Sequence, residues 1–275
     1  MARVKTFDMN YYNTYYFANI IHNVINDNFE YLRKLSDFFE TTMFLSDKFE
    51  KHSILHQFIG FVIDELFYES IDEELKRYEE VRIDEIKNKK FWINHALKHN
   101  GIAHESIKYW LKDYIDSKEH PEDLVYEYIN EFLLDERIQL TEKLTNEVFY
   151  LMFMNRKFLL KFNYTVSSHV SFLTPKDVDD EIKKLFKKPG VLKRVNIPEW
   201  VKNAVFFRDR GHCVFCNADL TNIITRLSVK NFDHIVPLNQ GGVNDVSNIQ
   251  LTCETCNHEK LDKEIKTSNS YELWY

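Results

Sequence analysis

The sequence predicts an α+β protein that is mostly helical, with a helical N-terminal domain and a small α+β domain at the C-terminus. Three observations predict it. Apolar residues recur at helical spacing from the start of the chain to about residue 172, and short strand-like runs follow residue 211. All four cysteines lie within 44 positions of the C-terminal part. The hydrophobic content of 44% is sufficient for a folded core.

The N-terminal part, residues 1–190, is predicted to be an acidic, all-helical domain. Apolar residues at spacings of three and four between Ile54 and Phe67, and again between Leu124 and Leu133, indicate amphipathic helices. Residues 1–182 carry a net charge of −11, whereas residues 183–275 carry +4. We therefore expect nucleic acid to bind the C-terminal part and not the acidic part.

The domain boundary is expected near residue 190, where Lys187–Gly190 closes a short helix. Pro198 is expected to open the next helix and Gly211 to end it. Beyond this helix, the runs "RLSVKNF" and "NIQLT" predict two short strands, and a final helix is expected near Cys256.

The cysteines form two Cys-x-x-Cys pairs, which favours a zinc site. The chain start lacks a secretory signal and no apolar run is long enough to span a bilayer, so we expect a cytoplasmic protein with no membrane contact. The cytoplasm is reducing, which disfavours disulfides. Four thiolates complete a closed tetrahedral site with a structural role. The predicted zinc ligands are Cys213, Cys216, Cys253 and Cys256.

The residues around the cysteine pairs carry a family pattern. Between the pairs lies "FDHIVPLNQGGVNDVSNIQLTC", and "CNHEK" begins at the last cysteine. This order and spacing resembles the HNH endonuclease family, in its zinc-stapled, four-cysteine ββα-metal type. The resemblance covers residues 200–263, about a quarter of the chain. It implies that residues 191–275 form a zinc-bound ββα-metal nuclease domain.

The resemblance also implies the roles of individual side chains. His234 would act as the general base that deprotonates the attacking water, and Asp233 and Asn257 would hold a catalytic Mg²⁺ or Mn²⁺ ion. Asn248 matches the middle letter of the HNH motif. In the family, the residue at this position braces the loop and orients the base. Asn257 occupies the position of the second metal ligand, which makes the sequence closer to an HNN variant than to HNH. His258, one residue later, is the alternative ligand.

The expected reaction is hydrolysis of phosphodiester bonds, with double-stranded DNA as the expected substrate. RNA or branched DNA cleaved by the same chemistry is one alternative, and a non-catalytic zinc module that binds nucleic acid or a protein is another. Five basic side chains are candidates for contacts to DNA phosphates: Lys260, Arg208, Arg210, Lys230 and Lys263.

The helical domain is expected to sense or bind a protein partner, or to form a homo-oligomer. By analogy with other nucleases that carry an additional domain, the chain is a candidate effector of a restriction or phage-defence system.

Overall fold

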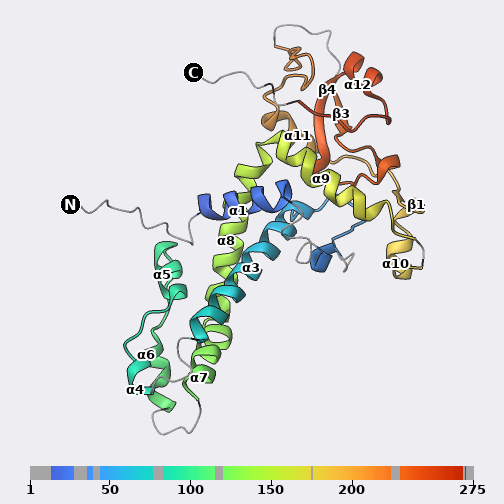
Figure 1. Cartoon of the computed structure of the whole chain (residues 1–275). Helices are drawn as coiled ribbons and strands as arrows, with labels where there is room; N and C mark the ends of the chain where they lie inside the picture. The colour runs from blue at the N-terminus through green and yellow to red at the C-terminus, as the bar shows by residue number, and fades with distance from the viewer. Residues whose placement is uncertain are drawn as a thin grey trace, which may run out of the picture. The chain divides into compact units, whose positions relative to one another are not determined.

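The computed structural model describes residues 14–27, 36–39, 44–76, 83–114, 120–174, 176–223, 230–268 and 270. The chain is mainly helical there, as predicted, and its strands form two antiparallel two-stranded sheets (Figure 1). It divides into two compact units, one of residues 1–17 and 59–148 and the other of residues 18–58 and 149–275. The boundary expected near residue 190 falls inside the second unit, and a separate domain of residues 1–190 stays a prediction.

The first unit contains helices and no strand within the described residues. Its α7 begins at Pro121 with two acidic residues in the first turn, as predicted, and Gly101 follows α5 with a positive φ of 71°. The unit contains most of α3 (Ile54–Leu75), α4 (Ile83–Ile86), α5 (Trp92–His99), α6 (Ile107–Trp110), a 3₁₀ turn (Leu111–Tyr114), α7 (Pro121–Glu127), a π-helical segment (Tyr128–Phe132) and most of α8 (Leu134–Phe153).

The helical part of the second unit has an aromatic core. It contains most of α1 (Thr14–Asn26), the first turn of α3, the end of α8 and α9 (Arg156–Val170). The ring of Phe58 lies 5.4 Å from the rings of both Phe38 and Phe162, between centroids, and all three side chains are buried. This core supports α9, which contacts the loops of the C-terminal part.

A small hairpin follows α9 and the short helix α10 (Asp180–Lys183). Strand β1 (Phe186–Lys188) pairs with β2 (Val191–Leu192). Gly190 in the turn has a φ of 69°, and a Cβ added there would lie 2.4 Å from the carbonyl oxygen of Ser171, so no larger residue fits. The two residues of β2 are buried, whereas Lys187 and Lys188 of β1 are exposed.

The C-terminal part has the predicted arrangement of two strands and a helix. Helix α11 (Glu199–Arg208) follows Pro198 and precedes Gly211. Strand β3 (Lys230–His234) pairs antiparallel with β4 (Ile249–Cys253), and α12 (Glu254–Lys260) contacts both strands (Figure 1). The last helix starts two residues before Cys256, because Cys253 caps it through its sulfur. Residues 224–229, which include the start of the first predicted strand, lie outside the described residues.

The loop between β3 and β4 is held by helices from distant parts of the sequence. It contains two 3₁₀ turns, Leu238–Gln240 and Val246–Asn248. The buried carboxylate of Asp245 accepts hydrogen bonds from the Ile54 backbone N–H at the start of α3 (2.8 Å) and from the backbone N–H and hydroxyl of Ser247 (2.9 and 2.6 Å). Asn163 of α9 donates to the carbonyl of Ser247 (3.0 Å). Residues 54 and 163 thus help to fix a loop of the C-terminal part.

Replacement of Asp245 is expected to destabilise the second unit. Asp245→Ala leaves the Ile54 N–H and both Ser247 donors without their acceptor in the interior, so we expect a loss of about 2–4 kcal/mol in the free energy of unfolding. Chemical denaturation measures the loss. The control is Asp177→Ala, since Asp177 accepts similar bonds from Thr174 at an exposed site. Equal effects of the two changes would contradict the role given to Asp245.

Candidate functional site

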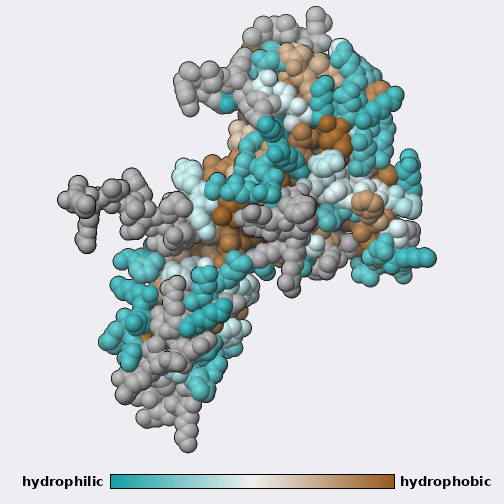
Figure 2. Space-filling view, viewed as in Figure 1, coloured by the Kyte–Doolittle hydropathy of each residue, from teal (hydrophilic) through white to brown (hydrophobic). Residues whose placement is uncertain are grey.

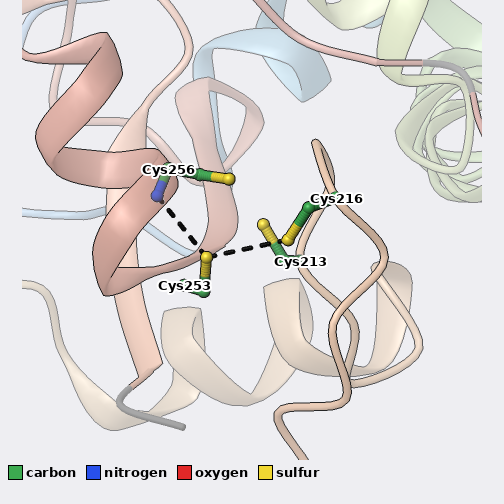
Figure 3. Close-up of side chains that lie close together, drawn as sticks. All are labelled: Cys213, Cys216, Cys253 and Cys256. Carbon is green, nitrogen blue, oxygen red and sulfur yellow. Dashed lines mark hydrogen bonds between the residues drawn. The ribbon is translucent and has the colours of Figure 1, made fainter.

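The four cysteines converge at one end of the β3–β4 hairpin, as predicted from their spacing. Cys213 and Cys216 come from the turn after α11, Cys253 ends β4, and Cys256 lies in α12 (Figure 3). The four sulfur atoms all lie within 4.8 Å of one another, and those of Cys216 and Cys253 are 3.7 Å apart. Asn217 has a φ of 59° and donates its N–H to the Cys213 carbonyl. This hydrogen bond closes the turn that contains Cys213 and Cys216.

These distances fit a zinc ion. Tetrahedral zinc at a Zn–S distance of about 2.3 Å places its sulfur ligands about 3.8 Å apart, close to the separation of Cys216 and Cys253. Burial and then the neighbouring thiols raise the pKa of Cys256, so a metal that binds here has to displace protons. Four thiolates fill the coordination sphere, and a site of this kind stabilises the fold but provides no open position for a reacting water.

A second site lies along the hairpin from the cysteines, at the end of β3. Asp233 and His234 line a pocket of about 360 Å³ together with Asn257 and His258 of α12. The structure therefore brings together four of the residues that the sequence singled out. Carboxylate and amide oxygens are the ligands that Mg²⁺ prefers, so Asp233 and Asn257 fit such an ion. Both Asn257 and His258 line the pocket, so which of the two is the second metal ligand stays a prediction.

His234 is almost fully buried, with 2% of its surface exposed. Burial lowers the pKa of its ring to about 3, and the charges of Arg194 and Lys260 act in the same direction, while the side chain of Asn244 opposes them. The ring is therefore neutral near pH 7. Within the described residues its Nε2 atom has no hydrogen-bond partner, which is unusual for a buried polar atom.

Asn248 braces the loop that follows β3. Its side-chain amide donates to the carbonyls of Val236 and Val243 (both 3.0 Å), and its oxygen accepts from the Val236 N–H (2.9 Å). Its own carbonyl accepts from the Ile235 N–H (2.7 Å). The hydrogen bonds described for Asn248 all go to this backbone, so it acts on His234 through the position of the loop and not through the ring.

Lys260 and Arg208 are internal and pair with internal groups, and their contact with DNA phosphates stays a prediction. The Lys260 ammonium is 2.9 Å from Oδ2 of Asp233 and donates to the His234 carbonyl (2.8 Å), with 3% of the residue exposed. The Arg208 guanidinium donates to Asp209 and to the Ile249 carbonyl, with 1% exposed. Both cations satisfy internal acceptors, which the sequence alone did not reveal.

The other three basic candidates have different surroundings. Lys230 and Lys263 are exposed, and the Lys230 ammonium lies 4.7 Å from the centroid of the Phe206 ring. Arg210 is half-buried with a positive φ of 57° in the turn after α11. None of the three lines the pocket that holds Asp233 and His234, and their contact with nucleic acid stays a prediction.

Four residues of the site were not predicted from the sequence. Gln250, opposite Asp233 in the strand register, donates to Oδ2 of Asp233 (3.1 Å). Lys187 and Arg194 line the pocket from the hairpin segment that precedes α11. Asn244 reaches His234 and also donates to the Lys193 carbonyl (2.8 Å). The basic residues between 183 and 194 were the one available signal, but this stretch was interpreted as the domain boundary.

Comparison with known proteins supports the C-terminal assignment. A family model described as HNH endonuclease matches residues 213–263. The match begins at the first cysteine and includes both strands and α12, so the chain contains an HNH domain at its C-terminus with a four-cysteine cluster. No curated protein matches the chain, and no solved structure matches it. Among the described helices, none has both the length and the apolar character needed to cross a bilayer.

The cysteine geometry predicts one equivalent of zinc per chain. Cys253→Ser, which removes the sulfur that both caps α12 and lies 3.7 Å from Cys216, is expected to lose the zinc and lower the melting temperature. Elemental analysis of protein purified without chelator measures the metal. Asp233→Asn is the control and should keep its zinc. Wild-type protein without zinc would contradict the assignment.

Proposed function

We propose that the chain is a metal-dependent endonuclease that hydrolyses phosphodiester bonds of double-stranded DNA. The observation that carries the proposal is the pocket lined by Asp233, Asn257 and His234, together with the buried Nε2 of His234, which has no hydrogen-bond partner among the described residues. The match of residues 213–263 to the HNH endonuclease family supports the same reaction class. A Mg²⁺ or Mn²⁺ ion, when bound, would stabilise the negative charge that develops on the phosphate and on the departing oxygen.

In this mechanism His234 is the general base. Its ring is neutral, and the free Nε2 accepts the proton of the attacking water. A phosphate in the pocket adds negative charge beside the ring and offsets the effect of Arg194, which raises the pKa of His234 towards the working pH. Asn248 and the hydrogen bond from Lys260 to the His234 carbonyl hold the backbone on either side of the ring.

Lys260 and Gln250 are positioning residues for Asp233 in this proposal. Both donate to Oδ2 of the Asp233 carboxylate, at 2.9 and 3.1 Å, and no hydrogen bond to Oδ1 is described. The carboxylate is therefore held in one orientation by the adjacent ammonium and amide. Its other oxygen is available to a divalent ion, with Asn257 or His258 of α12 as the second ligand.

Replacement of His234 tests the proposal directly. His234→Ala is expected to reduce Mg²⁺-dependent cleavage of supercoiled plasmid by about 10²–10⁴-fold, because the water loses its base. Zinc content and melting temperature serve as controls for the fold. Parallel assays with linear DNA, branched DNA, single-stranded DNA and RNA identify the substrate. Unchanged cleavage by the mutant would refute the base, and a wild type inactive on every substrate would favour a non-catalytic zinc module.

The role of Lys260 predicts a metal-dependent defect. Lys260→Met keeps most of the length of the side chain but removes the charge that holds Asp233, so we expect cleavage at subsaturating Mg²⁺ to fall by about tenfold or more. The control is Lys176→Met, an exposed lysine that does not line the pocket. Cleavage is measured as a function of Mg²⁺ concentration. Identical metal curves for the two variants would contradict the positioning role.

A further inference from the structure

The segment that links α9 to α11 carries a dense group of basic residues. Between residues 182 and 198 the chain has six lysines and arginines and no aspartate or glutamate. All six are exposed, and the surface over α10 and β1 is mainly hydrophilic (Figure 2). We call this group the basic hairpin; its members are Lys183, Lys184, Lys187, Lys188, Lys193 and Arg194.

Most of these charges are available to a ligand. Lys183 pairs with Asp180 (2.7 Å), and the ammonium of Lys193 donates to the Lys184 carbonyl (2.6 Å). No ion pair to Lys184, Lys187, Lys188 or Arg194 is found among the described residues. A solvated basic face usually carries interspersed acidic residues, and none is present in this stretch.

The basic hairpin is held rigidly beside the site. Val191 and Leu192 are buried, the Gly190 N–H donates to the Leu173 carbonyl (3.1 Å), and the turn packs against Ser171. Asn244 in the loop between β3 and β4 donates to the carbonyl of Lys193, the residue before Arg194. The hairpin is thus fixed to the same loop that carries Asn248.

Two members of the basic hairpin enter the site itself. Lys187 and Arg194 line the pocket with Asp233 and His234, and Arg194 is close enough to His234 to influence its ring. The exposed cations are therefore continuous with the pocket. A ligand that satisfies both must carry several negative charges, with one of them at the reacting position.

We propose that the basic hairpin binds the phosphate backbone of the nucleic acid on one side of the cleaved linkage. Arg194 and Lys187 contact the phosphates nearest to the pocket, and Lys184 and Lys188 contact the next ones along the strand. This inference rests on the proposed nuclease function and adds a substrate surface that lies outside residues 213–263, the segment matched by the family.

Salt-dependent binding tests the proposal. The experiment uses the full chain with His234→Ala, so that a fluorescent duplex DNA of about 20 base pairs binds without being cut. Lys184, Lys187 and Lys188 are replaced together by glutamine. The control replaces Lys87, Lys89 and Lys90 by glutamine, since that cluster loses the same charge elsewhere in the chain. Fluorescence anisotropy gives the dissociation constant at several NaCl concentrations, and zinc content verifies that each variant is folded.

We expect the hairpin variant to make the plot of log affinity against log salt concentration less steep by about 2–3 units, because each lost phosphate contact removes about 0.9 units from the steepness. Affinity at moderate salt should fall by at least tenfold, and the control variant should match its parent. If hairpin and control variants bind alike, the inference is wrong while the nuclease proposal stands. If the parent binds neither DNA nor RNA, the proposed function fails, and the inference fails with it.

Discussion

The position of the whole site depends on one buried group of charges around Asp209. Its carboxylate accepts two hydrogen bonds from Arg208 of α11 (both 2.8 Å) and one from the Leu251 N–H of β4 (2.9 Å), and Arg156 of α9 lies at 3.5 Å. These side chains are at most 2% exposed. Desolvation makes such a cluster expensive to form, and the loss of one partner leaves a buried charge without compensation. Its geometry therefore has few alternatives.

The constraint passes from this cluster to the pocket residues Asp233 and His234 through β4. Arg208 also donates to the Ile249 carbonyl, so α11 contacts β4 at residues 249 and 251. The strand register then places Gln250 opposite Asp233 and Ile249 opposite His234. At the far end of β4, Cys253 joins the cluster of thiols. One strand thus connects the buried charges, the metal-binding thiols and the pocket.

The sequence predicted those features whose chemistry is local. Each Cys-x-x-Cys pair is a single turn, so the spacing of the cysteines indicated a metal site. The helices and the ββα arrangement followed from periodicity for the same reason. The roles predicted for Asp233 and His234 came from the resemblance to the HNH family. The sequence did not predict where Lys260 and Arg208 point, because a buried cation and a surface cation look alike in a sequence, and only tertiary pairing distinguishes them. The hydrogen bond between Asp245 and Ile54 spans 191 residues and leaves no local pattern.

The bond from Asp245 to the first turn of α3 has a consequence for how such a protein can change during evolution. A fragment that begins near residue 190 would contain the family motif but would separate the carboxylate from the N–H of Ile54, and Ser247 from Asn163. Exchange of the HNH segment between genes would therefore need to carry the early helices with it, or to replace them by helices that offer equivalent donors. The structural unit that holds the motif is larger than the motif itself.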